Sequence, residues 1–473
     1  MSRNMDQWTA RELAHRVGTG GISAVDVATF FIERIQRLNP ALNAIVQFDA
    51  PGVVEQAVRV DQRLAAGEAL PLAGVPVTIK DNIWVGGCRV SQGSRLYADF
   101  VAPRDAWAVE RLRQLGAVML GITNCSEFAC KGVTSNPLYG TTVHPIDATL
   151  TPGGSSGGAV SALASGLGLL ALGTDAGGSV RRPAAHCGLV GLKPTFGVVP
   201  HPWGFAEPNY GISVIGLLAR NAGDCAFLLD HLCAYDAGDP ASPPIALASY
   251  CFAQVETDPA RTLRLAWSPR LGLDYAVDAD VLTKLQQCID ALRDDGWLIE
   301  DADPAWPQGI REYPLMALQE AGLQALYGDR CNAERCLIDP DLLKQIDAGA
   351  LRTPVEIATI LRLRERIGAS LTSFFETRDL LLCPTAPVTA WPATQLGPPM
   401  IGGTPAGPRG HAAFTPLFNY CGVPACSVPA GLVRGLPVGL QVVAPRFEDA
   451  RTLQFAAVVE RLQARHAYQA DAR

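Results

Sequence analysis

Two short glycine-rich stretches carry serines whose surroundings could support nucleophilic chemistry. The first runs from Thr151 to Val160 (TPGGSSGGAV) and contains Ser155, and the second runs from Gly173 to Ala185 (GTDAGGSVRRPAA) and contains Ser179. Clusters of glycine and serine let main-chain N–H groups approach a ligand closely, which is how an oxyanion hole is built. Such runs are also common as plain loops, but two of them flanking one apolar segment favour acyl transfer.

The second stretch places a hydroxyl directly after three small residues. Ser179 follows Ala176, Gly177 and Gly178, whose N–H groups could converge on a carbonyl oxygen while the hydroxyl attacks the carbonyl carbon. A serine hydroxyl is a weak nucleophile and needs a base. The chain has seven histidines, but none stands in a recognisable triad context, so we expect them at the surface or in packing.

A lysine is the other candidate base. Residues 74–84 read GVPVTIKDNIW, where Val75, Val77 and Ile79 alternate as in a half-buried strand that ends at Lys80. A lysine at a strand end is commonly a solvated charge. It can act as a base only if burial or neighbouring dipoles lower its pKa enough to populate the neutral amine.

Lys80, the TPGGSSGG segment and the TDAGGS segment together resemble the amidase signature family in order and spacing. The similarity extends over nearly the whole chain, with a more divergent middle from about 236 to 379. The further segments that resemble the family are Gly121–Ala129, Thr134–Thr142, Gly188–Val199, Phe414–Gly431 and Gly435–Val443.

The resemblance implies a role for each of these residues. Ser179 is expected to attack the substrate, Ser155 to relay protons and Lys80 to act as the base, with the Gly154–Ser155 peptide bond in cis. Ala129 is expected to present its backbone to the acyl pocket. No metal and no cofactor are implied.

The order of elements favours an α/β/α sandwich with a large mixed central sheet covered by helices, which is also the fold that the resemblance implies. We expect one domain over residues 1–473, with a mainly helical region on the substrate side at 236–379. Helices are predicted at Asp278–Asp295, Glu312–Tyr327, Thr353–Thr377 and Glu448–Ala464, and strands at Ala117–Ile122, Leu167–Gly173 and Leu380–Cys383.

Several other patterns leave more than one interpretation open. Residues 153–157 also satisfy the GxSxG pattern of α/β-hydrolases, but the preceding DATLTP is not the apolar strand that this motif requires. Arg181 is expected to pair with Asp175. Arg182 is either a solvated charge, which we favour, or a contact for a polar substrate. The roles of Lys131 and of the 201–210 loop stay open.

Composition narrows the class of protein further. The 473 residues are 48% hydrophobic and 18% charged, which is ample for a sizeable core, and the net charge of −7 offers no basic footprint for nucleic acid. Thirteen cysteines include no CxxC pair, and no apolar run reaches membrane-spanning length. These features predict a cytoplasmic protein with reduced thiols that binds neither nucleic acid nor membrane; a homodimer stays open.

The predicted function is therefore hydrolysis of a small carboxamide through a Ser179 acyl-enzyme, releasing a carboxylate and ammonia or an amine. The alternative is the glutaminase subunit of a tRNA-dependent amidotransferase, whose members usually carry GSSTE where this chain reads GVTSNP at 132–137. A member that only binds is disfavoured because all three catalytic positions are intact. Aliphatic amides, arylamides, hydrazides and lactams all remain candidate substrates.

Overall fold

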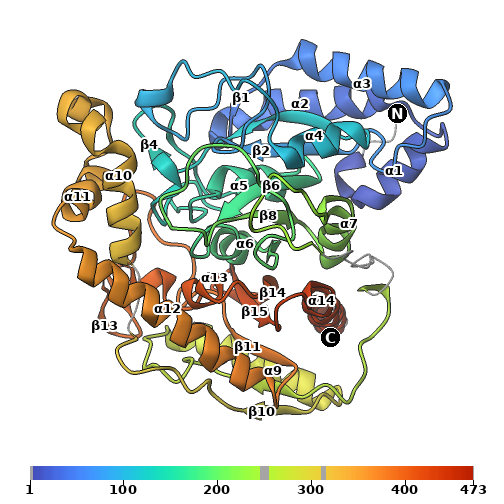
Figure 1. Cartoon of the computed structure of the whole chain (residues 1–473). Helices are drawn as coiled ribbons and strands as arrows, with labels where there is room; N and C mark the ends of the chain where they lie inside the picture. Colours follow the sequence, from blue (N-terminus) through green and yellow to red (C-terminus); the bar gives the residue numbers. More distant parts are fainter. Residues whose placement is uncertain (1–3, 245–254, 311–315, 408, 472–473) are drawn as a thin grey trace.

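A long mixed sheet forms the centre of the molecule (Figure 1). The computed structural model describes residues 4–244, 255–310, 316–407 and 409–471, and its side chains up to residue 465. The described strands form an 11-stranded sheet in the order β1-β3-β2-β6-β8-β7-β14-β15-β11-β9-β10. These strands are β1 (Ile45–Gln47), β2 (Pro76–Lys80), β3 (Val118–Thr123), β6 (Leu170–Asp175), β7 (Val190–Lys193), β8 (Val214–Ala219), β9 (Leu265–Trp267), β10 (Ile299–Asp301), β11 (Leu380–Pro384), β14 (Ala425–Val433) and β15 (Leu436–Val443).

The strand directions bring two sequence motifs to one edge of the sheet. Strand β2 pairs in parallel with β6, with Val77 opposite Leu170 and Ile79 opposite Leu172. Because parallel neighbours end at the same edge, the carboxyl ends of β2 and β6 lie beside each other. Lys80 ends the first strand and Asp175 ends the second, directly before the Ser179 turn.

Alternating side chains of the central strands bury both faces of the sheet. Ala171 and Leu218, which are paired across β6 and β8, pack in one cluster with Val160 and Ala184 of the helices on that side. Their neighbours in the strands, including Leu172, belong to a second and larger core cluster. Since strand side chains alternate between faces, helices must cover both, which confirms the predicted sandwich.

The predicted helices at 278–295 and 353–377 lie within two residues of their expected bounds, whereas those expected to end at Tyr327 and Ala464 continue to Glu334 and Asp471. Side chains cap the first two α-helices of the chain: Thr9 Oγ1 accepts the Glu12 N–H at 3.1 Å, and Ser23 Oγ accepts the Asp26 N–H at 2.9 Å. The helices are α1 (Ala10–Gly18), α2 (Ala24–Leu42), α3 (Ala50–Ala65), α4 (Trp107–Gln114), α5 (Gly157–Ala164), α6 (Arg181–Cys187), α7 (Ala222–Leu232), α9 (Ala279–Asp294), α10 (Met316–Glu334), α11 (Pro340–Gly349), α12 (Pro354–Phe375), α13 (Pro416–Tyr420) and α14 (Asp449–Asp471).

The divergent middle of the chain differs in part from the expectation. It contributes β9 and β10, which extend the central sheet, and it contains α11, which the sequence did not indicate. The predicted helix start at Glu312 lies outside the described residues. Helices α10 and α11 stand side by side at one edge of the molecule (Figure 1). The proline-rich 384–408 segment includes the short strands β12 (Met400–Ile401) and β13 (Thr404–Pro405).

No helix in the described part of the chain combines the length and the apolar character needed to span a bilayer.

Candidate active site

The Lys80 side chain reaches the first glycine-rich turn. Its Nζ lies 2.8 Å from Ser155 Oγ and 2.9 Å from Thr174 Oγ1, and Asn82 Nδ2 donates to the same Thr174 hydroxyl at 2.9 Å. Strands β2 and β6 and the turn that carries Ser155 thus bring an amine and two hydroxyls into one hydrogen-bonded group. The amine is oriented by two partners on different elements.

Burial changes the acid–base properties of this amine. Lys80 and Ser155 are both fully buried. Loss of hydration lowers the pKa of Lys80 from 10.5 to about 8, against the opposing influence of Cys125 and Asp175. Neutral amine is therefore available under mildly alkaline conditions.

Ser155 lies in a tight turn that precedes α5. The Gly154–Ser155 peptide bond is cis, as the resemblance implies. Thr134 Oγ1 donates to the Gly153 carbonyl at 3.0 Å and accepts the Gly157 N–H at 2.9 Å, so one side chain links both ends of the turn. A Cβ at Gly157 would overlap this threonine, which explains the glycine.

The turn that carries Ser179 is built around a buried ion pair. Asp175 accepts the Gly178 N–H at 2.7 Å and the Val180 N–H at 3.1 Å, and Arg181 Nη2 donates to its carboxylate at 2.8 Å. Both charged side chains are fully buried, which confirms the predicted pairing. Burial alone would raise the pKa of Asp175, but the charge and hydrogen bonds of Arg181 outweigh it and hold the pKa below its ordinary value.

Residues from the carboxyl-terminal third of the chain pack against this turn. Thr415 Oγ1 donates to the Gly177 carbonyl at 2.7 Å, and Arg181 donates to Gln441 Oε1 at 2.7 Å and to Asn419 Oδ1 at 2.5 Å. Gly178 has a φ of 107°, and a Cβ at this position would overlap Thr415. Only glycine adopts this φ readily and leaves room for the Thr415 side chain.

The two serine turns adjoin each other. The Ser156 N–H donates to the Ser179 carbonyl at 3.2 Å, and Ser155 and Ser179 line the same cavity. Among the hydrogen bonds of the described residues, none is donated by the N–H groups of Ala176, Gly177 or Ser179. Gly178 differs from the expectation, because its N–H already donates to Asp175 and is not free to bind a carbonyl oxygen.

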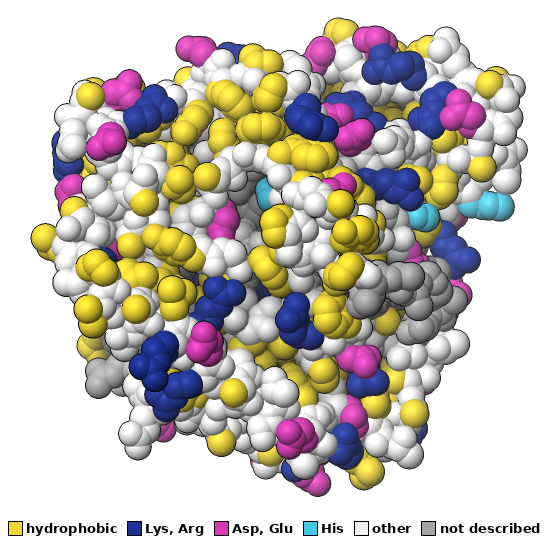
Figure 2. All heavy atoms as spheres, in the orientation of Figure 1, with side chains coloured by type: hydrophobic (Ala, Val, Ile, Leu, Met, Phe, Trp, Pro, Cys, Tyr) yellow, Lys and Arg dark blue, Asp and Glu magenta, His cyan; other side chains and the backbone are white. Residues whose placement is uncertain are grey.

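A small cavity lies in front of Ser179. Its water-accessible volume is about 70 Å³. Apolar and polar groups both contribute to its wall. Figure 2 shows a hollow in the centre of the face it presents, with hydrophobic side chains around it and acidic and histidine side chains at its edge. The described residues that line the cavity are Asn82, Gln92, Phe128, Ala129, Ser155, Thr174, Ala176, Ser179, His201, Phe205, Ala206, Glu207, Pro208, Asn209, Ser213, Val214 and Ile215.

The wall at Ala129 is a strained turn that packs on α10. Phe128 and Ala129 have φ values of 50° and 59°. The Phe128 N–H donates to the Gln92 carbonyl at 2.9 Å, and its ring stacks on Tyr327 with centroids 4.0 Å apart and an interplanar angle of 8°. These two contacts fix the backbone of the turn and the Phe128 ring at the cavity wall.

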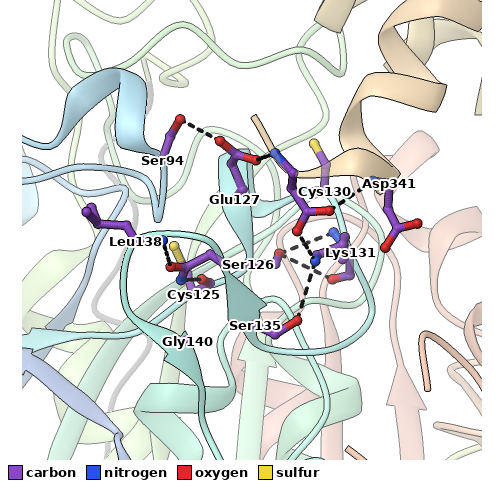
Figure 3. A network of polar contacts seen from close by, with 12 residues as sticks. Ser94, Cys125, Ser126, Glu127, Cys130, Lys131, Ser135, Leu138, Gly140 and Asp341 are labelled. Carbon is purple, nitrogen blue, oxygen red and sulfur yellow. Dashed lines mark hydrogen bonds and ion pairs between the residues drawn. The ribbon is translucent and has the colours of Figure 1, made fainter. Parts of the chain in front are cut away.

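A buried polar network fixes the same turn to α11. Ser94 Oγ donates to Glu127 at 2.5 Å, and the other carboxylate oxygen accepts the Asp339 N–H at 2.7 Å (Figure 3). Lys131 forms a buried ion pair with Asp339, which also accepts the Asp341 N–H at 2.9 Å and so caps α11. Burial raises the pKa of Glu127 to about 7.

Other predicted candidates occupy different places. Arg182 is only 4% exposed, so the favoured solvated charge is wrong; its Nη2 donates to the Gly154 carbonyl at 3.4 Å. Lys131 is paired in the network rather than exposed to the cavity. Phe205 reaches the cavity wall, whereas Trp203 packs against Arg104 and Tyr210 is exposed.

Thr174, Asn82 and Thr415 are site residues that the sequence analysis missed. Thr174 stands inside the GTDAGGS motif and Asn82 two residues after Lys80, so both could have been found by asking what orients the amine. Thr415 carries no local signal, because it contacts Gly177 from 238 positions away in the sequence.

Comparisons with known proteins agree with this architecture. The family model described as Amidase matches residues 26–453. An acylamidase of Rhodococcus erythropolis is 36% identical over 97% of this chain and 96% of its own length, and the A-type subunit of the glutamyl-tRNA(Gln) amidotransferase of Chromohalobacter salexigens is 34% identical over 96% of each. A bacterial aryl acylamidase of the amidase signature family superposes with a TM-score of 0.88 at 26% identity, covering 96% of both chains.

A second solved structure, 6-aminohexanoate cyclic dimer hydrolase with its substrate, has a TM-score of 0.85 at 27% identity and 97% coverage of both chains. The fold, with its lysine and two serine turns at one sheet edge, is that of an amide hydrolase. The chain belongs to the amidase family, and it acts on the C–N bond of amides.

Removing the cation from the Ser179 turn tests the energetic importance of the buried pair. Arg181→Gln leaves the Asp175 carboxylate buried without its partner, so we expect a loss of about 3 to 5 kcal/mol in the free energy of unfolding. Urea denaturation followed by tryptophan fluorescence measures this loss. Arg335→Gln removes half of an exposed ion pair with Asp347 and should leave the stability nearly unchanged; equal effects of the two variants would contradict the assignment.

Proposed function

We propose that the protein hydrolyses a small carboxamide through an acyl-enzyme on Ser179, with Ser155 as proton relay and Lys80 as base. The observation that carries this proposal is the buried Lys80 amine 2.8 Å from the Oγ of Ser155, a residue that lines the same cavity as Ser179. A lysine buried in this way does not serve as a solvated surface charge. Its lowered pKa suits it to accept a proton.

In the first half of the reaction, Ser179 Oγ attacks the amide carbonyl carbon. Its proton passes to Ser155 Oγ while the proton of Ser155 passes to the neutral amine of Lys80. The negative charge that develops on the carbonyl oxygen is stabilised by the N–H groups of Ala176, Gly177 and Ser179. Their lack of other hydrogen-bond acceptors in the described structure supports this role.

Collapse of the tetrahedral intermediate breaks the C–N bond. The leaving nitrogen takes a proton from Ser155, which is reprotonated by Lys80, and ammonia or an amine departs. Water then attacks the acyl-enzyme with the same relay acting in the same order, and Ser179 recovers its proton as the carboxylate leaves. Thr174 and Asn82 keep the Lys80 amine aligned through both halves.

The cavity supports a small substrate. Its water-accessible volume of about 70 Å³ suits a compact amide. Phe128, Phe205 and Ile215 offer an apolar wall, and the Ala129 turn is placed to contact the acyl group.

Replacing the proposed nucleophile gives a direct test. Ser179→Ala should lower kcat for any amide substrate by at least about 10³-fold, because the variant lacks the hydroxyl that forms the proposed acyl-enzyme. Ammonia release measures the rate, and circular dichroism checks the fold. Ser213→Ala alters another serine of the same cavity and should keep most of the activity; a fully active Ser179→Ala protein would rule out this mechanism.

The proposed base predicts an acid limb in the pH profile. Because the pKa of Lys80 is lowered to about 8, the neutral amine disappears as pH falls, and kcat/KM should drop about tenfold per pH unit below that value. Lys344, whose side chain is 76% accessible, provides a control for a lysine outside the site, and Lys344→Met should show the same acid limb as the wild type. A wild-type profile that stays flat through mildly acid pH would exclude a lysine base.

The second candidate function is that of a glutaminase subunit, because relatives named as the A-type subunit of glutamyl-tRNA(Gln) amidotransferase are 32 to 35% identical to this chain. Residues 132–137 (GVTSNP) depart from the GSSTE string usual in that group. The purified chain alone should therefore hydrolyse simple aliphatic or aryl amides with a higher kcat/KM than glutamine. Glutamine as the best substrate, or activity that requires a partner protein, would favour the second function.

A further inference from the structure

The 201–211 loop supplies an acidic side chain to the cavity in front of Ser179. Phe205, Ala206, Glu207, Pro208 and Asn209 all line the cavity, and Glu207 is the only acidic residue among its described lining residues. The loop follows strand β7 in the chain and returns to the sheet at β8. The cavity that holds the proposed catalytic groups is thus also lined by one acidic residue.

The loop is held firmly enough to place this carboxylate. Arg364 of α12 donates to the Tyr210 carbonyl at 2.9 Å and to the Gly211 carbonyl at 3.2 Å. Glu207 itself accepts the Asn209 N–H at 2.8 Å on one oxygen and the Gly211 N–H on the other. These bonds fix both the backbone and the plane of the carboxylate.

The carboxylate keeps free capacity for a ligand. An ionised carboxylate has about four acceptor positions, and each oxygen of Glu207 uses one of them for a main-chain N–H. Arg364, the nearby cation, donates to main-chain carbonyls and forms no direct ion pair with Glu207 among the described residues, although the two charges interact at longer range.

The rest of the lining does not neutralise this charge. His201 lines the same cavity, and burial lowers its pKa, so its ring adds no positive charge at neutral pH. Gln92, Asn209 and Ser213 contribute only neutral polar groups. A negative charge facing a small enclosed space attracts a substrate with a positive group.

We propose that Glu207 is a specificity-determining residue that selects amides carrying an ammonium group over neutral amides of the same length. The proposal rests on the function proposed above and narrows its substrate class to amino amides. The substrate ammonium donates to the free acceptor positions of Glu207 while its amide carbonyl faces Ser179.

A purely structural role for Glu207 makes a different prediction. If the side chain only braces the loop, its replacement should impair neutral and cationic substrates equally. If its charge also binds the substrate, replacement should impair the cationic substrate more than the neutral one. The ratio between the two substrates therefore separates the two roles within one variant.

The experiment compares linear alkanamides with the ω-ammonium alkanamides of the same chain length, using ammonia release by the wild type and by Glu207→Gln. Glutamine has no charge and keeps one of the two oxygen acceptors for the loop, so any loss through the loop itself is shared by both substrates. We expect the wild type to prefer the ammonium member by about tenfold in kcat/KM at its best chain length, and the ratio of kcat/KM between the two members to fall to about one in Glu207→Gln. Glu55→Gln, which removes an exposed acid from α3, should keep the preference.

Binding measured on Ser179→Ala gives a second readout. Calorimetry with the same pairs should show tighter binding of the ammonium member, and this difference should vanish in the Ser179→Ala, Glu207→Gln double variant. Hydrolysis of neutral amides without any ammonium preference would overturn the role of Glu207 and leave the proposed function intact. Absence of hydrolysis together with ammonium-selective binding would overturn the proposed function instead, and absence of both would overturn both.

Discussion

The burial of the Lys80 amine without a carboxylate partner is the constraint on which the rest of the site depends. No carboxylate in the described ranges lies within ion-pair distance of its Nζ, and its hydrogen-bond partners are the hydroxyls of Ser155 and Thr174 and the Thr174 carbonyl. The longer-range charge of Asp175 offsets desolvation only in part, so the neutral amine is favoured relative to a solvated lysine. Arg181 shows the opposite arrangement in the adjacent turn, where a paired cation stabilises a buried anion. Arg181 thus stabilises the structure of its turn, whereas the Lys80 amine has no paired anion and can take part in proton transfer.

The divergent middle of the chain is connected to the site through α10 and α11. Tyr327 stacks on Phe128, and Asp339 is bound both by Glu127 and by Lys131. These contacts join the least family-like region to the turn that lines the cavity. Changes in α10 or α11 can thus alter the shape of the cavity wall without affecting the Lys80 and Ser155 group.

Much of the site could be predicted because its chemistry is encoded in short local motifs. Lys80, Ser155 and Ser179 each stand in a segment whose residue types are constrained by close backbone packing, and the alternation of helix and apolar strand indicated the sandwich. The solvated position predicted for Arg182 is wrong because the exposure of a side chain depends on which other segments pack over it. The engaged N–H of Gly178 and the contact from Thr415 depend on tertiary geometry that no local pattern reports. Short strands such as β9 and β10 carry too few residues for a clear alternating pattern.

The contacts of Arg181 with residues 415, 419 and 441 have a consequence for biosynthesis. The Ser179 turn is encoded before the midpoint of the gene, yet the residues that hold it in place are translated near the end. A nascent polypeptide that has emerged only as far as α12 lacks these braces around Ser179. The enzyme therefore acquires its working geometry late, once β15 has left the ribosome and joined the sheet.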